Sequence, residues 1–194
     1  MRSWLTAFKR NSVAVVSDGS AVLGLGNIGP EAAMPVMEGK ALLFKYLGGV
    51  DAYPICLDTK DPEKIIEACK LIKPTFGGIN LEDIEKPKCF FVLDKLRADK
   101  DMDIPVWHDD QQGTATVEVA GSINALKVVG KKLNEASIVL VGTGAANIAT
   151  SRILVAAGAE KKNIVAVDSK GILNANRKDL EMDKSQNPFK WDLC

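Results

Sequence analysis

Two pairs of acidic residues are the part of this sequence best suited to chemistry. The pairs are Glu82-Asp83, after the apolar run 75–79, and Asp109-Asp110, after the apolar run 104–107. Both runs are expected to be buried strands of a parallel sheet, joined by a helix over about 88–99. Parallel strands joined in this way end at the same edge, where open α/β sheets bind ligands. Carboxylates that meet there repel one another unless a cation lies among them, and oxygen ligands favour Mg²⁺ or Mn²⁺. The alternative is that each pair is a set of solvated loop acids.

Composition excludes several classes of protein. The chain has 194 residues with 25 basic and 25 acidic side chains, so no electrostatic field attracts nucleic acid or an anionic membrane. Its apolar stretches are short and broken, which excludes a transmembrane helix, and its start lacks the apolar core of a signal peptide. The cysteines lack CxxC spacing and are expected to be reduced thiols in a cytoplasmic protein. They are Cys56, Cys69, Cys89 and Cys194.

A single histidine, His108, limits the chemistry further. A zinc site built on several histidines cannot come from this chain alone. A Ser-His-Asp hydrolase would need His108 as its base, yet the sequence has no G-x-S-x-G motif.

The pattern along the chain alternates strands and helices, which indicates an α/β protein with a mostly parallel sheet. Strands are expected at 13–16, 21–25, 52–57, 137–141 and 164–167, and helices at about 30–47, 62–73, 114–129 and 145–157. The first helix is expected to break at Pro35 and Gly39. The second is expected to begin with Asp61 as N-cap and Pro62 at its first position. From about Asp183 the polar sequence predicts a loosely ordered tail.

Two glycine-rich loops differ in meaning. The stretch 24–29 satisfies G-x-G-x-x-G but lacks a suitably placed acid downstream, so it is expected to be a tight backbone turn in the substrate region. The second loop begins at Gly142 and is followed by a helix and by a strand that ends in Asp168, which is the layout of a dinucleotide site. Its expected cofactor-binding residues are Gly142, Gly144, Ala145, Ala146, Asn147 and Asp168.

Asn147 stands where that motif has its third glycine, so helix and strand are expected to pack further apart. Asp168 favours NAD, whereas Lys170 nearby suits the 2′-phosphate of NADP, and both coenzymes stay open. The alternative for the whole loop is an ordinary turn between strand and helix.

Lys40 lies in an otherwise apolar stretch. A lysine in a desolvated cleft has a lowered pKa and can act as a base near neutral pH. The alternative is a solvated lysine on the surface of a helix.

Taken together, these motifs resemble the malic enzymes, specifically their shorter bacterial and archaeal branch. The resemblance covers about residues 11–176, and its motifs are 13–20, 22–29, 37–40, 55–58, 77–83 and 108–115. It implies a substrate and metal domain over 1–111, lacking its usual N-terminal part, and a partial Rossmann-type NAD(P)-binding domain over 112–194. The implied reaction is oxidative decarboxylation of L-malate to pyruvate and CO₂ with reduction of NAD or NADP.

The resemblance also implies roles for individual residues. Glu82, Asp83 and Asp110 would bind Mg²⁺ or Mn²⁺, with Asp109 in support. Lys40 would take the malate hydroxyl proton, and Thr114 would lie near the cofactor. The family further implies a homodimer or a larger homo-oligomer.

Two features of the family pattern have no match. The tyrosine that serves as general acid precedes the segment 13–20, where this chain has twelve residues and no tyrosine, and the NAD domain continues beyond the strand that ends at Asp168. We therefore expect little or no activity from this chain alone and an exposed apolar sheet edge. A fragment, a subunit completed by another chain and a degenerate relative stay open.

Two other functions compete. One is a 2-hydroxy-acid dehydrogenase without decarboxylation that uses His108. The other is a module that binds metal or nucleotide, or dimerises, without catalysis.

Overall fold

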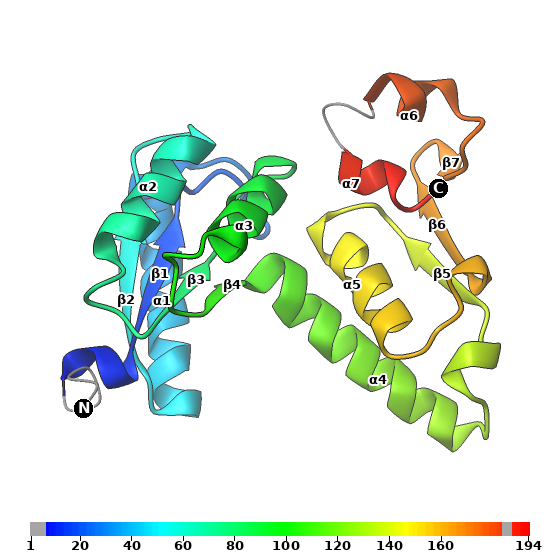
Figure 1. Ribbon diagram of the computed structural model, residues 1–194, viewed down its shortest axis with the longest axis horizontal. Helices are drawn as coiled ribbons and strands as arrows, with labels where there is room; N and C mark the ends of the chain where they lie inside the picture. The colour runs from blue at the N-terminus through cyan, green and yellow to red at the C-terminus, as the bar shows by residue number, and fades with distance from the viewer. Residues whose placement is uncertain (1–6, 184–187) are drawn as a thin grey trace. The chain divides into compact units, whose positions relative to one another are not determined.

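The computed structural model describes residues 7–183 and 188–194 and divides the chain into two compact units. The first unit ends at Asp109 and the second begins at Asp110. Both units are α/β, as the alternating pattern predicts (Figure 1).

The first unit is a parallel four-stranded sheet with helices on both faces. Its strand order is β2-β1-β3-β4. The strands are β1 (Ser12–Ser17), β2 (Asp51–Cys56), β3 (Gly78–Leu81) and β4 (Val106–His108). The helices are α1 (Gly29–Gly48), α2 (Pro62–Ile72) and α3 (Lys88–Ala98), and the short 3₁₀-helix η2 (Phe8–Asn11) precedes β1.

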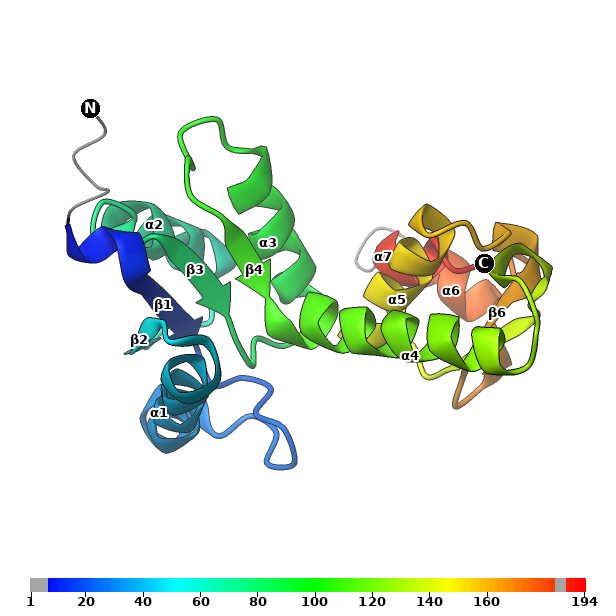
Figure 2. The same ribbon diagram turned by 90° about the horizontal axis from the view of Figure 1, so that it is seen from below.

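The order of the strands determines where a ligand can bind. The chain moves from β1 outward to β2, then returns past β1 to β3 and continues to β4. Because such crossovers are right-handed, α1 covers one face of the sheet and α2 and α3 cover the other (Figure 2). The direction reverses between β1 and β3, and a crevice at the carboxyl ends of the strands forms at such a point.

The core of the first unit consists of β1, β3 and the helix faces packed on them. Ala14, Val15 and Val16 in β1 are completely buried. Asp61 caps α2 as expected, since its side chain accepts a hydrogen bond of 2.9 Å from the backbone N–H of Glu63. Burial raises the pKa of the Cys69 thiol on α2 to about 12, so this thiol stays protonated. All four cysteines are present as thiols, as expected.

Two predictions for the segment after β1 are wrong. Residues 21–25 form no strand; they form a turn in which the backbone N–H of Val22 donates to the carbonyl of Gly26 at 2.9 Å. The helix α1 is not broken at Pro35 or Gly39. Ala33 and Met37, completely buried on either side of Pro35, pack against the unit's core and stabilise the helix through the proline.

The second unit has a three-stranded sheet in the order β5-β6-β7. Its strands are β5 (Ile138–Val141), β6 (Ile164–Asp168) and β7 (Gly171–Ile172), and its helices are α4 (Thr114–Val128), α5 (Ala145–Ala156), α6 (Lys178–Asp183) and α7 (Pro188–Trp191). A π-helical turn (Asp109–Gly113) precedes α4, and the 3₁₀-helices η4 (Leu133–Glu135) and η5 (Lys161–Asn163) precede β5 and β6. β5 and β6 are parallel, whereas β7, which the pattern did not predict, is antiparallel to β6.

One face of this sheet is packed and the other is exposed. The packed face forms a core of Val119, Leu140, Leu154, Ala159, Ala166, Leu173 and Leu180. Trp191 and Leu193 pack against this core, so the described part of the tail is ordered and the prediction of a loose tail is wrong there; residues 184–187 lie outside the described residues. Val139 and Val141 of β5 are 60% and 81% exposed, which provides the expected exposed apolar surface.

Among the described residues, no helix is both long enough and apolar enough to cross a membrane.

Glycine substitutions in the first unit should have opposite effects on stability. Gly19 has a φ of +64°, and an added Cβ would lie 2.2 Å from the carbonyl oxygen of Gly29. Gly19→Ala should therefore lower the free energy of unfolding by about 2 kcal/mol or more. Gly39 is exposed inside α1 with open space around it, so Gly39→Ala should raise that free energy by about 0.5–1 kcal/mol. Urea denaturation measures both, and a Gly19→Ala variant as stable as the parent would contradict this account.

Candidate metal centre and nucleotide loop

Three carboxylates meet at the ends of β3 and β4. The strands are parallel neighbours with Leu81 opposite His108, so the residues that follow them leave the sheet at the same level. One carboxylate oxygen from each of Glu82, Asp83 and Asp110 lies within 4.8 Å of the other two. Asp110 is only two residues beyond β4, and that strand therefore fixes its position. The convergence expected from the two acidic pairs is confirmed for these three residues.

The backbone around Glu82 and Asp83 is held by the loop that follows β1. The N–H of Glu82 donates to the carbonyl of Val16 at 2.9 Å, and the N–H of Ala21 donates to the carbonyl of Asp83 at 2.9 Å. Asp83 has a φ of +54°. Among the described residues it is the one non-glycine residue with a positive φ. Aspartate tolerates this left-handed conformation better than most residues.

The three carboxylates fit a divalent cation with a preference for oxygen. Glu82 and Asp83 are 7% and 3% exposed, and burying charged carboxylates side by side is costly without a compensating positive charge. Oxygens bound to one Mg²⁺ at about 2.0–2.1 Å lie about 3–4 Å apart, which is compatible with three oxygens that lie within 4.8 Å of one another. Carboxylate oxygens are ligands that Mg²⁺ and Mn²⁺ prefer.

Lys40 of α1 lies at the edge of this cluster. Its Nζ is 2.7 Å from Oδ2 of Asp109 and 3.2 Å from Oε2 of Glu82. Burial acts to lower the pKa of Lys40, but the hydrogen bond that Lys40 donates to Asp109 and the negative charge of Glu82 outweigh this effect, so the pKa is raised. The expectation of a lowered pKa is wrong for this structure because two carboxylates stabilise the ammonium form. Asp109 supports Lys40 from beside the three clustered carboxylates.

His108 is not placed for catalysis. It lies in β4 and is completely buried. Burial lowers its pKa to about 4, although the nearby charge of Asp109 acts in the opposite direction. A buried, neutral imidazole cannot exchange protons with a substrate, which disfavours the dehydrogenase that would use it.

Sequence reasoning missed Asn80. This residue is 2% exposed in β3, and its Nδ2 donates to Oε2 of Glu82 at 2.7 Å. The strand expected at 75–79 ended before Asn80, whereas β3 continues through Leu81. An amide between Ile79 and Leu81 in such a strand needs a hydrogen-bond partner when it is buried, and this signal was present in the sequence.

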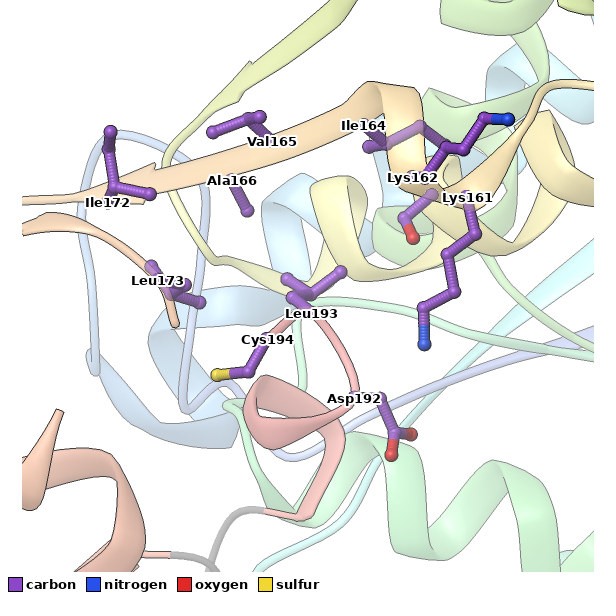
Figure 3. Close-up of a pocket in the computed structure, with 11 residues that line it drawn as sticks. Lys161, Lys162, Ile164, Val165, Ala166, Ile172, Leu173, Asp192, Leu193 and Cys194 are labelled. Carbon is purple, nitrogen blue, oxygen red and sulfur yellow. The ribbon is translucent and has the colours of Figure 1, made fainter. Parts of the chain in front are cut away.

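One pocket is lined in part by residues next to the carboxylate cluster, and another is lined by residues other than those expected to bind a cofactor. In the first unit, a pocket of about 390 Å³ is lined largely by apolar side chains, including Phe44 and Trp107, with Asn80 and Asp109 among its polar residues. In the second unit, a pocket of about 450 Å³ has an apolar wall from β6 and β7, with Leu193 and Cys194 across from it and Lys161 at one end (Figure 3). The lining of the second pocket includes none of the residues expected to bind a cofactor.

The nucleotide loop connects β5 to α5. Gly142 has a φ of +99°, and its N–H donates to the carbonyl of Val167 at 2.7 Å. Gly144 is the N-cap of α5, and Ala145 and Ala146 begin its first turn, where backbone N–H groups favour phosphate. Asn147 donates from Nδ2 to the carbonyls of Val141 and Gly142 at 2.8 and 3.0 Å. The side chain that replaces the third glycine therefore ties the loop to the strand.

Asp168 ends β6, as the nucleotide-site layout predicts, and its carboxylate is held within the chain. Arg177 donates to both oxygens at 2.8 and 3.1 Å, and Nζ of Lys190 lies 2.7 Å from Oδ2. The Arg177 guanidinium, together with Lys190, holds the pKa of Asp168 well below its usual range. Nothing in the spacing of the sequence pointed to these two cations. Thr114, half-buried, is the first residue of α4.

Replacing Asn147 should loosen the nucleotide loop. Asn147→Ala removes two hydrogen bonds, each worth about 0.5–1.5 kcal/mol, without adding bulk. Hydrogen–deuterium exchange over residues 141–148 should become at least several-fold faster. Asn163→Ala is the matched control, because the Asn163 amide makes one exposed bond of 3.3 Å to the carbonyl of Asn134. Equal protection of residues 141–148 in the parent and in Asn147→Ala would refute the role of this side chain.

Family models match both units. The model of the malic enzyme N-terminal domain matches residues 1–64 and 59–97, and the model of the malic enzyme NAD-binding domain matches residues 111–192.

Individual relatives agree. An NAD-dependent malic enzyme of Geobacillus stearothermophilus is 60% identical over 97% of this chain and 37% of the relative. An NADP-dependent malic enzyme of Escherichia coli is 50% identical over 91% of this chain and 23% of the relative. The crystal structure of a malic enzyme from Pyrococcus horikoshii is 53% identical, with a TM-score of 0.90 over 98% of this chain and 43% of that one. The chain thus spans less than half the length of these relatives, and it belongs to the malic enzyme family.

Proposed function

We propose that this chain carries the metal centre and the first part of the nucleotide site of a malic enzyme. The reaction would be oxidative decarboxylation of L-malate to pyruvate and CO₂ with reduction of a nicotinamide coenzyme. The observation that carries this proposal is the meeting of Glu82, Asp83 and Asp110 within 4.8 Å beside Lys40. Residues 1–111 would form the substrate and metal domain, and residues 112–194 would form the nucleotide domain.

Glu82, Asp83 and Asp110 would hold the Mg²⁺ or Mn²⁺. Bound there, the ion would supply Lewis-acid polarisation of the oxygens of the substrate. The burial of Glu82 and Asp83 supports this assignment, because it excludes the water that would otherwise screen their charges.

In its neutral amine form, Lys40 would take the proton of the malate hydroxyl as hydride leaves for the nicotinamide. A divalent cation bound to Glu82 would lower the pKa of Lys40 from the raised value found without the ion, because like charges disfavour the ammonium form. Asp109 and Glu82 hold its Nζ from two sides, at 2.7 and 3.2 Å, so the group that exchanges the proton has a defined position. Asp109 therefore acts through Lys40.

The coenzyme would bind along the loop 142–147, with Thr114 near it and Asp168 toward the adenosine ribose. The N-terminus of α5 suits the pyrophosphate. NAD is the proposed coenzyme. NADP is the alternative, supported by the positive charges of Arg177 and Lys190, which pair with Asp168, and of Lys170, which pairs with Asp179.

We further propose a cytoplasmic homodimer or larger homo-oligomer with no nucleic-acid or membrane partner. Apolar side chains exposed along α1 support self-association, since exposed apolar patches often mark interfaces. They are Leu42, Leu43, Tyr46 and Leu47.

The test of the function is NADH formation by the purified chain with L-malate, NAD and Mn²⁺, followed by absorbance, with pyruvate identified as product. At most weak turnover is expected of this chain alone, and excess EDTA should abolish it. Lys40→Ala should lower the rate by about a hundredfold or more, the usual contribution of a positioned acid–base group. Lys45→Ala is the matched control, because Lys45 lies on the same helix in an exposed ion pair with Asp51.

Turnover that survives EDTA, or equal rates for Lys40→Ala and Lys45→Ala, would contradict the proposal. Binding of Mn²⁺ or NAD without turnover agrees with the little or no activity expected of this chain alone and fits the non-catalytic module equally well. Comparing the rates with NADP and with NAD in the same assay determines which coenzyme is preferred.

A further inference from the structure

We propose that Asn80 is a positioning residue of the metal centre: its side-chain amide fixes the orientation of the Glu82 carboxylate. The proposal rests on the function proposed above and concerns a residue outside the three proposed metal ligands.

Asn80 is a polar residue in a buried strand whose neighbouring residues are apolar. In β3, Ile79 and Leu81 are buried apolar residues, and Asn80 between them is 2% exposed. Asparagine is disfavoured in strands, and burying an amide is costly unless its polar atoms are hydrogen-bonded. A residue retained only for packing at this position would be apolar.

The hydrogen bonding of Asn80 is directed at Glu82. Nδ2 donates to Oε2 of Glu82 at 2.7 Å, and the reverse orientation of the amide would set two oxygens against each other. Oδ1 is buried and makes no hydrogen bond with the described residues. The amide is thus only half satisfied, and the satisfied half faces a proposed metal ligand. This arrangement is expected of a side chain retained for a site at a cost in stability.

The same carboxylate oxygen receives a second contact. Nζ of Lys40 lies 3.2 Å from Oε2 of Glu82, on a side chain that comes from α1. Asn80 lies in β3, two residues before Glu82. Side chains from a strand and from a helix therefore both contact Oε2 of Glu82. Fixing one oxygen from two sides limits rotation of the carboxylate and therefore determines where its other oxygen points. Residues that orient metal ligands in this way commonly contribute 10–100-fold to metal affinity.

The test is Mn²⁺ affinity, measured by titration calorimetry, for the parent chain and three variants. Asn80→Asp keeps the shape but places a carboxylate against Glu82, and Asn80→Ala removes the donor without adding charge. Asn11→Asp is the matched control, because the Asn11 amide also donates to a carboxylate, Asp51, at 3.3 Å, but at an exposed position. We expect both Asn80 variants to bind Mn²⁺ at least tenfold more weakly. Asn11→Asp should bind within twofold of the parent.

Thermal unfolding without metal separates positioning from folding. A purely structural Asn80 would lower the melting temperature of its variants and leave their Mn²⁺ affinity unchanged, which would overturn the proposal. Tighter binding by Asn80→Asp would also overturn it, because the new carboxylate would then act as a ligand. If Asn80→Asp does not fold, Asn80→Ala decides the outcome. Absence of Mn²⁺ binding by the parent would refute the metal centre itself, whereas equal affinities refute only the role of Asn80.

Discussion

Repulsion among clustered carboxylates is the constraint on which the site at the ends of β3 and β4 depends. Glu82, Asp83 and Asp110 present oxygens within 4.8 Å of one another, and the first two are nearly inaccessible to water. Their mutual repulsion is strong where water is excluded. The surrounding structure supplies positive charge and hydrogen-bond donors instead, from the ammonium of Lys40 and the amide of Asn80. A divalent cation among the carboxylates would stabilise this concentration of negative charge, and the proposed chemistry requires such an ion.

The turn that follows β1 stabilises the backbone around this cluster. The turn after β1 lies between α1, which carries Lys40, and the loop that carries Asp83. Its residue Asp18 is buried and forms an ion pair with Lys88 of α3. Ser20 donates to the same aspartate at 2.6 Å and accepts a hydrogen bond from the backbone N–H of Glu85 at 2.9 Å. One turn therefore links β1, α3 and the loop that carries Asp83 at the point where the strand order reverses, so the candidate site depends on packing well beyond its own residues.

Most helices and strands, and the convergence of the acidic residues, could be predicted from the sequence because they follow from short-range rules. Apolar runs bounded by turns located β3 and β4, and the shared edge of parallel strands brought their acidic pairs together. What it missed depends on tertiary contacts. Packing overrides the helix-breaking tendency of Pro35, and the pKa of Lys40 is set by two carboxylates from distant strands. Arg177 reaches Asp168 across a polar segment with no periodic pattern to reveal it.

The central claim is that Glu82, Asp83 and Asp110 hold one divalent cation. The most direct measurement is anomalous diffraction from crystals of the chain grown with Mn²⁺, collected near the manganese absorption edge. The account predicts an anomalous peak about 2.1–2.2 Å from a carboxylate oxygen of each of the three residues, close to the distances known for Mg²⁺. An anomalous peak located elsewhere, or no peak between these residues at saturating Mn²⁺, would contradict it.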